Sequence, residues 1–305
     1  MKWISFLKED GEQRCGILSE DGFVIDIHEA TCSELPDNLL GFLEGLSLYE
    51  DKVKELTSLK LSDKGTYPLE NIKLLAPLPT PKSFRDFYAF EQHVKTAREN
   101  RGLEMVPEWY EIPVFYFSNH MAIKGPEESI NKPAECEWLD YELEVAAVIG
   151  KEGRDIPAEE AENYIFGFMI LNDWSARDLQ RKEMKVGLGP AKGKDFATST
   201  GPWILTKEEL EDDRKGKGYN LQMKAFVNGK LLSQGNMGAL YYSFGEMIER
   251  ASAGVTLYPG EIIGSGTVGT GCILELGADA HRWLKPGDEV ELQIDKLGVL
   301  KNTIE

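Results

Sequence analysis

The chain has 305 residues, of which 52 are acidic and 34 basic, so its formal net charge is −18. This charge disfavours nucleic acids and anionic membranes as partners, because both repel an acidic protein. The composition, 42% hydrophobic with 10% aromatic residues, is that of a folded protein, and the length allows one or two domains.

The sequence also bears on the compartment. No apolar run reaches the roughly eighteen residues that a membrane span needs. The first residues, MKWISFLKEDG, become acidic too early for a signal peptide. The cysteines are far apart and form no CxxC pair: Cys15, Cys32, Cys136 and Cys272. Free thiols favour a reducing compartment, so we expect a cytoplasmic protein.

The first part of the chain alternates short apolar and polar segments. Residues 2–7, 15–20 and 22–27 predict strands of a small antiparallel sheet. Residues 34–46 and 49–59 follow and predict two helices. The stretch LLAPLPTPKS then interrupts the chain with three prolines. We therefore predict a small N-terminal β-rich domain over residues 1–71 and a larger domain over residues 72–305.

The larger part begins with two predicted helices. In residues 85–100, apolar side chains recur at steps of three and four, which predicts a helix. Residues 157–167 start with a proline at a first helical position and end in glycine, which predicts another. Residues 168–173, FMILND, are a buried strand that leads into a predicted helix over residues 175–184.

The remainder is rich in glycine and in strand patterns. LTKEEL carries a capping box, Thr206 with Glu209, and KAFVNGKLL predicts a hairpin with an Asn-Gly turn. Residues 240–254 predict a helix, and the tail alternates turns with strands. Many strands with few helices predict an α+β fold that is predominantly β.

The stretch EWLDYELEVAAVIG places two carboxylates two residues apart in a strand pattern. Glu142 and Glu144 therefore point to the same face. A solvated face is the usual explanation for such a pair. If the strand is buried, a positive group must lie between the two charges. Oxygen-only ligands then favour a hard divalent cation such as Mg²⁺, Mn²⁺ or Ca²⁺.

A third carboxylate, Asp173 of FMILNDWSARDLQ, ends an apolar strand just before a helix. Arg177 and Gln180 lie three residues apart on that helix and share a face. Asp173 and Arg177 are four residues apart, so a local ion pair between them explains their spacing as well as a functional site does.

Two more segments carry reactive side chains. Lys194 lies in the glycine-bounded loop GPAKGKDFATSTGPW. It is interpreted either as a surface charge, or as a counter-ion to the carboxylates that also donates a hydrogen bond to a substrate oxygen. FRDFYAFEQHV places Asp86, Tyr88, Glu91 and His93 close together, and histidine is the side chain best suited to move protons near neutral pH. The other histidines are interpreted as structural: His28, His120 and His281.

In combination, these stretches resemble the fumarylacetoacetate hydrolase family. The similarity covers roughly residues 72 to 300 and includes, in order, DFYAFEQH, PEWYEIPVFY, LDYELE, FGFMILNDWSARDLQ, GKDFATSTGPW and GSGT…ILELG. The resemblance implies a β-roll catalytic domain with an internal metal site, and a homodimer. The N-terminal part is much shorter than in fumarylacetoacetase and is more similar to the small leading domain of bacterial members.

The resemblance also implies roles for individual residues. The metal, Mg²⁺ with Mn²⁺ or Ca²⁺ as alternatives, has as ligands Glu142, Glu144, Asp173 and Asp86. The active-site positions around the metal are Lys194, Arg177 and Gln180. The substrate contacts are Tyr88, Tyr116 and Thr267. The pair that activates water is His93 with Glu275. In fumarylacetoacetase an arginine that binds substrate follows the catalytic histidine, and both Arg98 and Arg101 are candidates here.

Three functions are consistent with this resemblance. The first is a divalent-metal-dependent hydrolase that cleaves a carbon–carbon bond in a 2-oxo or 1,3-diketo acid, such as fumarylacetoacetate or an acylpyruvate. The second keeps the metal but is an isomerase, tautomerase or decarboxylase of an oxo-dicarboxylic acid, such as 2-hydroxyhepta-2,4-diene-1,7-dioate or oxaloacetate. The third is a non-catalytic protein that binds a metal–carboxylate complex, which His93 and Lys194 disfavour because plain binding needs no proton carrier.

Overall fold

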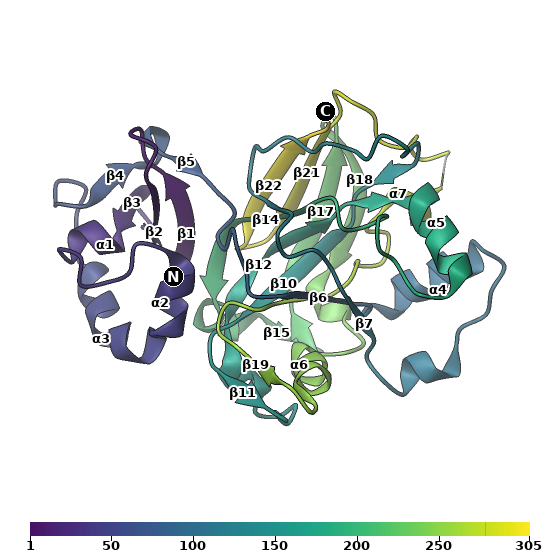
Figure 1. The fold of residues 1–305 in the computed structure, drawn as a ribbon, viewed down its shortest axis with the longest axis horizontal. Helices are drawn as coiled ribbons and strands as arrows, with labels where there is room; N and C mark the ends of the chain where they lie inside the picture. Colours follow the sequence, from purple (N-terminus) through teal and green to yellow (C-terminus); the bar gives the residue numbers. More distant parts are fainter. Residues whose placement is uncertain (278) are drawn as a thin grey trace.

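The computed structural model describes residues 1–277 and 279–305, and strands dominate it (Figure 1). The α-helices are α1 (Ile27–Ala30), α2 (Leu39–Glu44), α3 (Leu46–Leu56), α4 (Glu91–Glu99), α5 (Arg177–Val186), α6 (Phe244–Ser252) and α7 (Ile273–Leu276). The 3₁₀ helices are η1 (Leu69–Asn71), η2 (Pro107–Tyr110), η3 (Ala161–Tyr164), η4 (Lys207–Asp213) and η5 (Met237–Ala239).

A large mixed sheet runs through the molecule. Its strands, in spatial order, are β4 (Thr66–Pro68), β3 (Phe23–Asp26), β2 (Gln13–Leu18), β1 (Lys2–Leu7), β14 (Thr198–Thr206), β12 (Ile165–Asp173), β10 (Leu143–Ile149), β20 (Ile262–Gly264), β6 (Phe84–Phe87) and β7 (Phe115–Phe117). Two short strands pair beside this path: β5 (Lys73–Leu74) with β1, and β8 (Ile123–Lys124) with β14.

A second, antiparallel sheet of four strands lies beside it. Its order is β18 (Lys230–Asn236), β17 (Gln222–Val227), β21 (Glu289–Ile294) and β22 (Gly298–Thr303). Three two-stranded ribbons complete the fold: β11 (Gly153–Arg154) with β19 (Thr256–Leu257), β13 (Ser175–Ala176) with β9 (Leu139–Asp140), and β15 (Arg214–Lys215) with β16 (Gly218–Tyr219).

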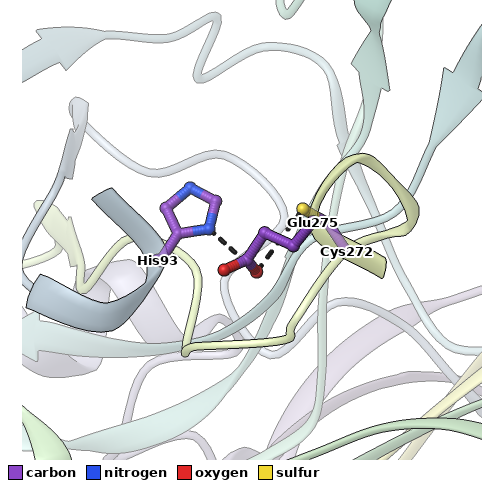
Figure 2. Close-up of side chains that lie close together, drawn as sticks. All are labelled: His93, Cys272 and Glu275. Atoms are coloured by element: carbon purple, nitrogen blue, oxygen red, sulfur yellow. Dashed lines mark hydrogen bonds and ion pairs between the residues drawn. The ribbon is translucent and has the colours of Figure 1, made fainter. Parts of the chain in front are cut away.

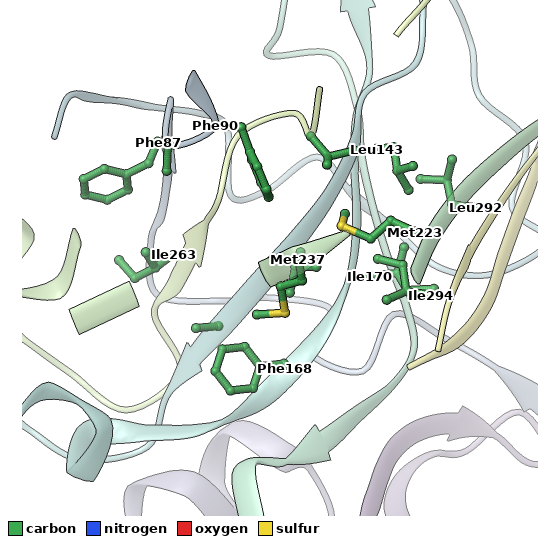
Figure 3. Close-up of a cluster of buried hydrophobic side chains, with 14 of the residues drawn as sticks. Phe87, Phe90, Leu143, Phe168, Ile170, Met223, Met237, Ile263, Leu292 and Ile294 are labelled. Carbon is green, nitrogen blue, oxygen red and sulfur yellow. The ribbon is translucent and has the colours of Figure 1, made fainter. Parts of the chain in front are cut away.

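Strand β10 is buried along its whole length, and its side chains alternate between two cores. Leu143 and Val145 join a cluster that includes Met223 and Leu292 of the four-stranded sheet (Figure 3). Ala146 points the other way, into a cluster shared with the N-terminal helices. This double burial makes the strand apolar throughout, except for the glutamates at its start.

The predicted α+β fold with mostly strand structure is confirmed. The N-terminal strands and helices lie together at one side of the molecule (Figure 1), and strand β1 joins them to the large sheet by pairing with β14. The division into residues 1–71 and 72–305 stays a prediction. No helix among the described residues is long and apolar enough to cross a membrane.

Most of the predicted elements are confirmed. The strands near residues 2–7, 15–20 and 22–27 are β1, β2 and β3, and the two helices that follow are α2 and α3. The hairpin of KAFVNGKLL joins β17 to β18. The helix predicted over residues 175–184 overlaps α5, which continues to Val186, and the helix predicted over residues 240–254 contains α6.

Three local predictions were wrong. Residues 85–100 are not one helix, because β6 pairs with β20 and β7 before α4 begins at Glu91. Residues 157–167 contain only the short η3 before β12 starts at Ile165. The capping box of Thr206 and Glu209 does not form, since both side chains instead accept hydrogen bonds from the amino group of Met1.

Candidate active site

Four buried carboxylates from neighbouring strands converge in the larger part of the chain. Asp86 lies on β6, Glu144 on β10 with Glu142 just before it, and Asp173 ends β12. One oxygen from each lies within 4.8 Å of the others. The four predicted metal-ligand positions are therefore brought together, and the solvated alternative for the glutamate pair is excluded.

The sheet register explains this convergence. β20 lies between β6 and β10, and Gly264 pairs with Asp86 on one side and with Ala146 on the other. A Cβ at Gly264 would lie 2.4 Å from Oδ1 of Asp86, so a larger residue would displace that carboxylate. The next loop residue, Gly266, donates its backbone N–H to the same oxygen at 3.2 Å.

Two carboxylate oxygens in the cluster lack any hydrogen-bond partner among the described residues. They are Oε2 of Glu144 and Oδ1 of Asp173, both fully buried. A buried charged oxygen without a partner is costly. Oxygen-only donors at this spacing match the ligands that Mg²⁺, Mn²⁺ and Ca²⁺ prefer, so the residues present fit a divalent cation.

Two buried cationic side chains balance part of this charge. Lys194 donates to Oδ2 of Asp173 at 2.6 Å and to Oε2 of Glu142 at 2.5 Å. Arg177 donates to Oε1 of Glu142 at 2.7 Å and to Oε1 of Gln180 at 3.1 Å. Lys194 is therefore the buried counter-ion and not a surface charge, and the alternative of a local pair between Asp173 and Arg177 is wrong.

The charge balance sets the acidity of each group. Burial raises the pKa of Glu142, but Arg177 and Lys194 outweigh burial and hold it well below its usual range. Burial and the charge of Asp173 raise the pKa of Asp86 to about 8. Burial and the neighbouring carboxylates raise the pKa of Glu144 well above its ordinary value. The cluster therefore holds protons near neutral pH unless a cation replaces them.

Asp140 is a site residue that the sequence reasoning missed. It accepts from Nε of Arg177 at 2.9 Å and from the backbone N–H groups of Ile273 at 2.8 Å and Leu274 at 3.0 Å. It thereby ties β9 to the start of α7 and fixes the guanidinium that contacts Glu142. The signal was present in LDYELE, where Asp140 precedes the two glutamates at the same two-residue spacing.

The three predicted substrate contacts all border the cluster. The phenol of Tyr116 donates to Asp173, and Thr267 Oγ1 donates to Oε1 of Glu144 at 3.3 Å. Tyr88 packs edge-on against His93, with ring centroids 5.3 Å apart, and burial raises its pKa to about 12. Burial also raises the pKa of Tyr116 well above its ordinary value, so both phenols stay neutral at physiological pH.

His93 and Glu275 form the predicted pair (Figure 2). Nδ1 of His93, on α4, lies 3.0 Å from Oε2 of Glu275, on α7, and both side chains are buried. Cys272, which sequence reasoning did not place here, donates its S–H to the same carboxylate oxygen at 3.7 Å. A carboxylate at Nδ1 favours the tautomer with its proton on that nitrogen, which leaves Nε2 free to accept a proton.

The structure separates the two arginine candidates. Arg98 donates Nε to the backbone oxygen of Glu104 at 2.5 Å, whereas Arg101 donates to that of Ala97 at 2.8 Å. The charge of Arg101 opposes the rise in the pKa of Tyr88 that burial causes. Arg101 therefore lies close enough to Tyr88 for its charge to act on that residue.

Comparison with known proteins identifies the family. A family model described as the fumarylacetoacetate (FAA) hydrolase C-terminal domain matches residues 82–305. The chain belongs to the fumarylacetoacetate hydrolase family. A crystal structure named fumarylacetoacetate hydrolase, from psychrophilic Exiguobacterium antarcticum, is similar at a TM-score of 0.76 and 27% identity, covering 100% of this chain and 99% of that one.

Two curated relatives carry a different activity in their names. The oxaloacetate tautomerase YisK of Bacillus subtilis is 32% identical over 78% of this chain and 75% of its own length. The mitochondrial oxaloacetate tautomerase fahd2 of Xenopus laevis is 31% identical over 100% of this chain and 90% of its own length. The predicted family is thus confirmed, whereas carbon–carbon hydrolysis, the homodimer and the cytoplasmic location stay predictions.

Proposed function

We propose that this protein is a divalent-metal-dependent tautomerase that interconverts the keto and enol forms of an oxo-dicarboxylic acid of the oxaloacetate type. One observation carries the proposal: a buried histidine–carboxylate pair, His93 with Glu275, lies near the oxygen-only cluster, close enough for the charge of His93 to help lower the pKa of Glu142. Tautomerisation needs a group that moves a proton at carbon and a fixed positive charge at oxygen. The two relatives named oxaloacetate tautomerases support this choice over hydrolysis.

The proposed cation is Mg²⁺, held by the carboxylates of Asp86, Glu142, Glu144 and Asp173. When bound, a divalent cation acts as a Lewis acid that polarises the adjacent oxygens of a 2-oxo acid. The two carboxylate oxygens that lack hydrogen bonds support Glu144 and Asp173 as two of the residues that would hold it.

The chain's own side chains supply the proton transfer. Glu275 holds the His93 ring through Nδ1, so Nε2 takes a proton from the carbon next to the oxo group, while the oxo oxygen gains a proton from solvent to give the enol. In the reverse reaction the enol oxygen loses its proton to solvent, and Nε2 returns its proton to the carbon. Lys194 stays charged, because Asp173 and Glu142 outweigh burial and raise its pKa. Its ammonium group is placed to stabilise the negative charge that develops on the oxo oxygen.

A C–C hydrolase of a diketo acid is the second candidate. The same histidine–glutamate pair is suited to take a proton from water, as a base oriented by a carboxylate. The structural similarity to a protein named fumarylacetoacetate hydrolase favours it as well. Hydrolysis differs from tautomerisation in two ways. It needs a water molecule beside the substrate carbonyl, and its carbon–carbon bond breaks to release a carbanion.

A substrate panel distinguishes these functions. Purified protein is stripped with a chelator, reloaded with Mg²⁺, and given enol-oxaloacetate, an acylpyruvate and fumarylacetoacetate. We expect faster enol-to-keto conversion, followed by ultraviolet absorbance, with little CO₂ release or acid production. Cleavage of the diketo acids without acceleration of tautomerisation would favour the hydrolase, CO₂ release the decarboxylase, and ligand binding without turnover the non-catalytic protein.

A further inference from the structure

A second group of metal-ligating side chains lies outside the carboxylate cluster. One ligand atom from each of His93, Cys272 and Glu275 lies within 4.8 Å of the other two. Cys272 and Glu275 are one turn apart at the start of α7 and share a face, while His93 reaches them from α4 (Figure 2). Two rigid helices therefore hold the three donors in place.

Two of the three residues, His93 and Glu275, have a buried polar atom without a hydrogen-bond partner. His93 and Glu275 are only 4% and 9% exposed, yet Nδ1 of His93 and Oε1 of Glu275 have no aligned hydrogen-bond partner among the described residues. The 3.0 Å contact of Nδ1 with Oε2 of Glu275 is an ion-pair distance without hydrogen-bond alignment. Buried polar atoms without partners at one point indicate a place for a further ligand.

The donor types differ from those of the carboxylate cluster. Thiolate, imidazole and carboxylate are the ligands of Zn²⁺, at about 2.0–2.3 Å each, so ligand atoms of a tetrahedral zinc lie roughly 3.5 Å apart. Oε2 of Glu275 lies 3.0 Å from Nδ1 of His93 and 3.7 Å from Sγ of Cys272, which brackets that spacing. Mg²⁺, by contrast, prefers oxygen ligands and octahedral geometry.

We propose that His93, Cys272 and Glu275 form a second, inhibitory metal site that binds Zn²⁺ or a similar thiolate-binding cation, separate from the carboxylate cluster. On binding, the S–H bond of Cys272 breaks, its proton leaves to solvent, and a zinc–sulfur bond forms. Nδ1 of His93 becomes a ligand, and the neutral ring then carries its proton on Nε2. The nitrogen that accepts the substrate proton is thereby blocked.

The inhibitory effect rests on the proposed tautomerase activity, but the site itself does not. Binding is therefore measured without substrate. Co²⁺ is added to protein kept in excess Mg²⁺, with the exposed Cys32 changed to serine to remove a competing thiol. We expect a sulfur-to-cobalt charge-transfer band that saturates at one equivalent and is lost when Zn²⁺ displaces the cobalt.

Two cysteine variants in that background decide whether Cys272 is the ligand. Cys272→Ser keeps a donor toward Glu275 but removes the thiolate, so the band is expected to disappear. Cys136→Ser changes another buried cysteine and should leave the band intact. No band in the parent protein, or an unchanged band in Cys272→Ser, would overturn the site.

Inhibition is then measured by following tautomerase activity at fixed Mg²⁺ as the Zn²⁺ concentration is raised. The activity of each variant is expressed relative to its own activity without zinc. Because Cys272→Ser removes one zinc ligand, it is expected to raise the Zn²⁺ concentration that halves the activity by about tenfold or more. A cobalt band without zinc inhibition would overturn the inhibitory role while the site stands. If tautomerase activity is absent in every protein, the proposed function fails, and the cobalt band still decides the site.

Discussion

The ammonium group of Lys194 donates a hydrogen bond to Oδ2 of Asp173 at 2.6 Å, and both side chains are buried. A lysine in that position is a fixed charge whose orientation is already set before substrate binds. Such preorganised charges are the most effective stabilisers of a developing oxyanion.

We therefore expect Lys194→Met to lower kcat by about a hundredfold or more. Lys192→Met is the matched control, because Lys192 lies two residues away, is exposed, and pairs its ammonium group with Asp195. Steady-state kinetics of both variants at saturating Mg²⁺ measure the effect. A Lys194→Met protein with the parental rate would show that this charge has no part in the reaction.

Glu144 tests the metal site itself. Its Oε2 is buried without a hydrogen-bond partner among the described residues, so we expect it to contact the cation directly. Glu144→Gln keeps the shape and removes the charge, and its affinity for Mn²⁺ should fall by roughly tenfold to a hundredfold. Titration of chelator-treated protein followed by electron paramagnetic resonance gives the affinity. Glu208→Gln, at an exposed position, should bind Mn²⁺ like the parent.

The raised pKa values of Asp86 and Glu144 predict pH-dependent metal binding. Asp86, with a pKa of about 8 in the cation-free protein, is protonated at neutral pH and must lose its proton before it can hold a cation. Mg²⁺ affinity should therefore fall as pH decreases below about 8. Calorimetry in buffers of different ionisation enthalpy measures the released protons, and Asp86→Asn should release fewer. If Mg²⁺ affinity did not change between about pH 6 and pH 8, the raised pKa of Asp86 would be contradicted.

Parts of this site could be predicted from local patterns. The two-residue spacing in a strand places Glu142 and Glu144 on one face, and the apolar run FMILND places Asp173 at a strand end. The spacing in LDYELE points to Asp140, but its contacts with α7 could not be predicted, and neither could the position of Cys272 near His93. Both depend on the packing of α7 against β9 and α4, which are far apart in the sequence.

Competing patterns explain the wrong elements. Residues 85–100 have helical spacing, but the first of them pair with β20 and β7, and this tertiary pairing outweighs the local periodicity. Thr206 and Glu209 have capping-box spacing, yet the amino group of Met1 binds both side chains. That competitor lies 205 residues away from Thr206, so no local motif reveals it.

The family resemblance implies that an arginine after the catalytic histidine binds substrate, and the charge of Arg101 acts on Tyr88. We therefore predict that Arg101 binds the distal carboxylate of the substrate. Arg101→Ala should raise KM by about tenfold and change kcat less, since it removes a contact made in both ground and transition states. Arg98→Ala is the matched control, three residues earlier on the same segment. Equal effects of the two changes on KM would show that neither arginine is specific for the substrate.

His93 separates proton transfer from metal binding. His93→Ala removes the base but leaves all four carboxylates in place, so kcat should fall by about a hundredfold to ten-thousandfold. Affinity for Mn²⁺ at the carboxylate cluster should stay within about twofold, because the ring is not among the four oxygen donors. His28→Ala, which alters a histidine bound to the backbone oxygen of Leu35, serves as the control for a general effect of losing a histidine. Full tautomerase activity in His93→Ala would show that another group moves the proton, whereas loss of Mn²⁺ binding together with activity would place His93 in the metal site.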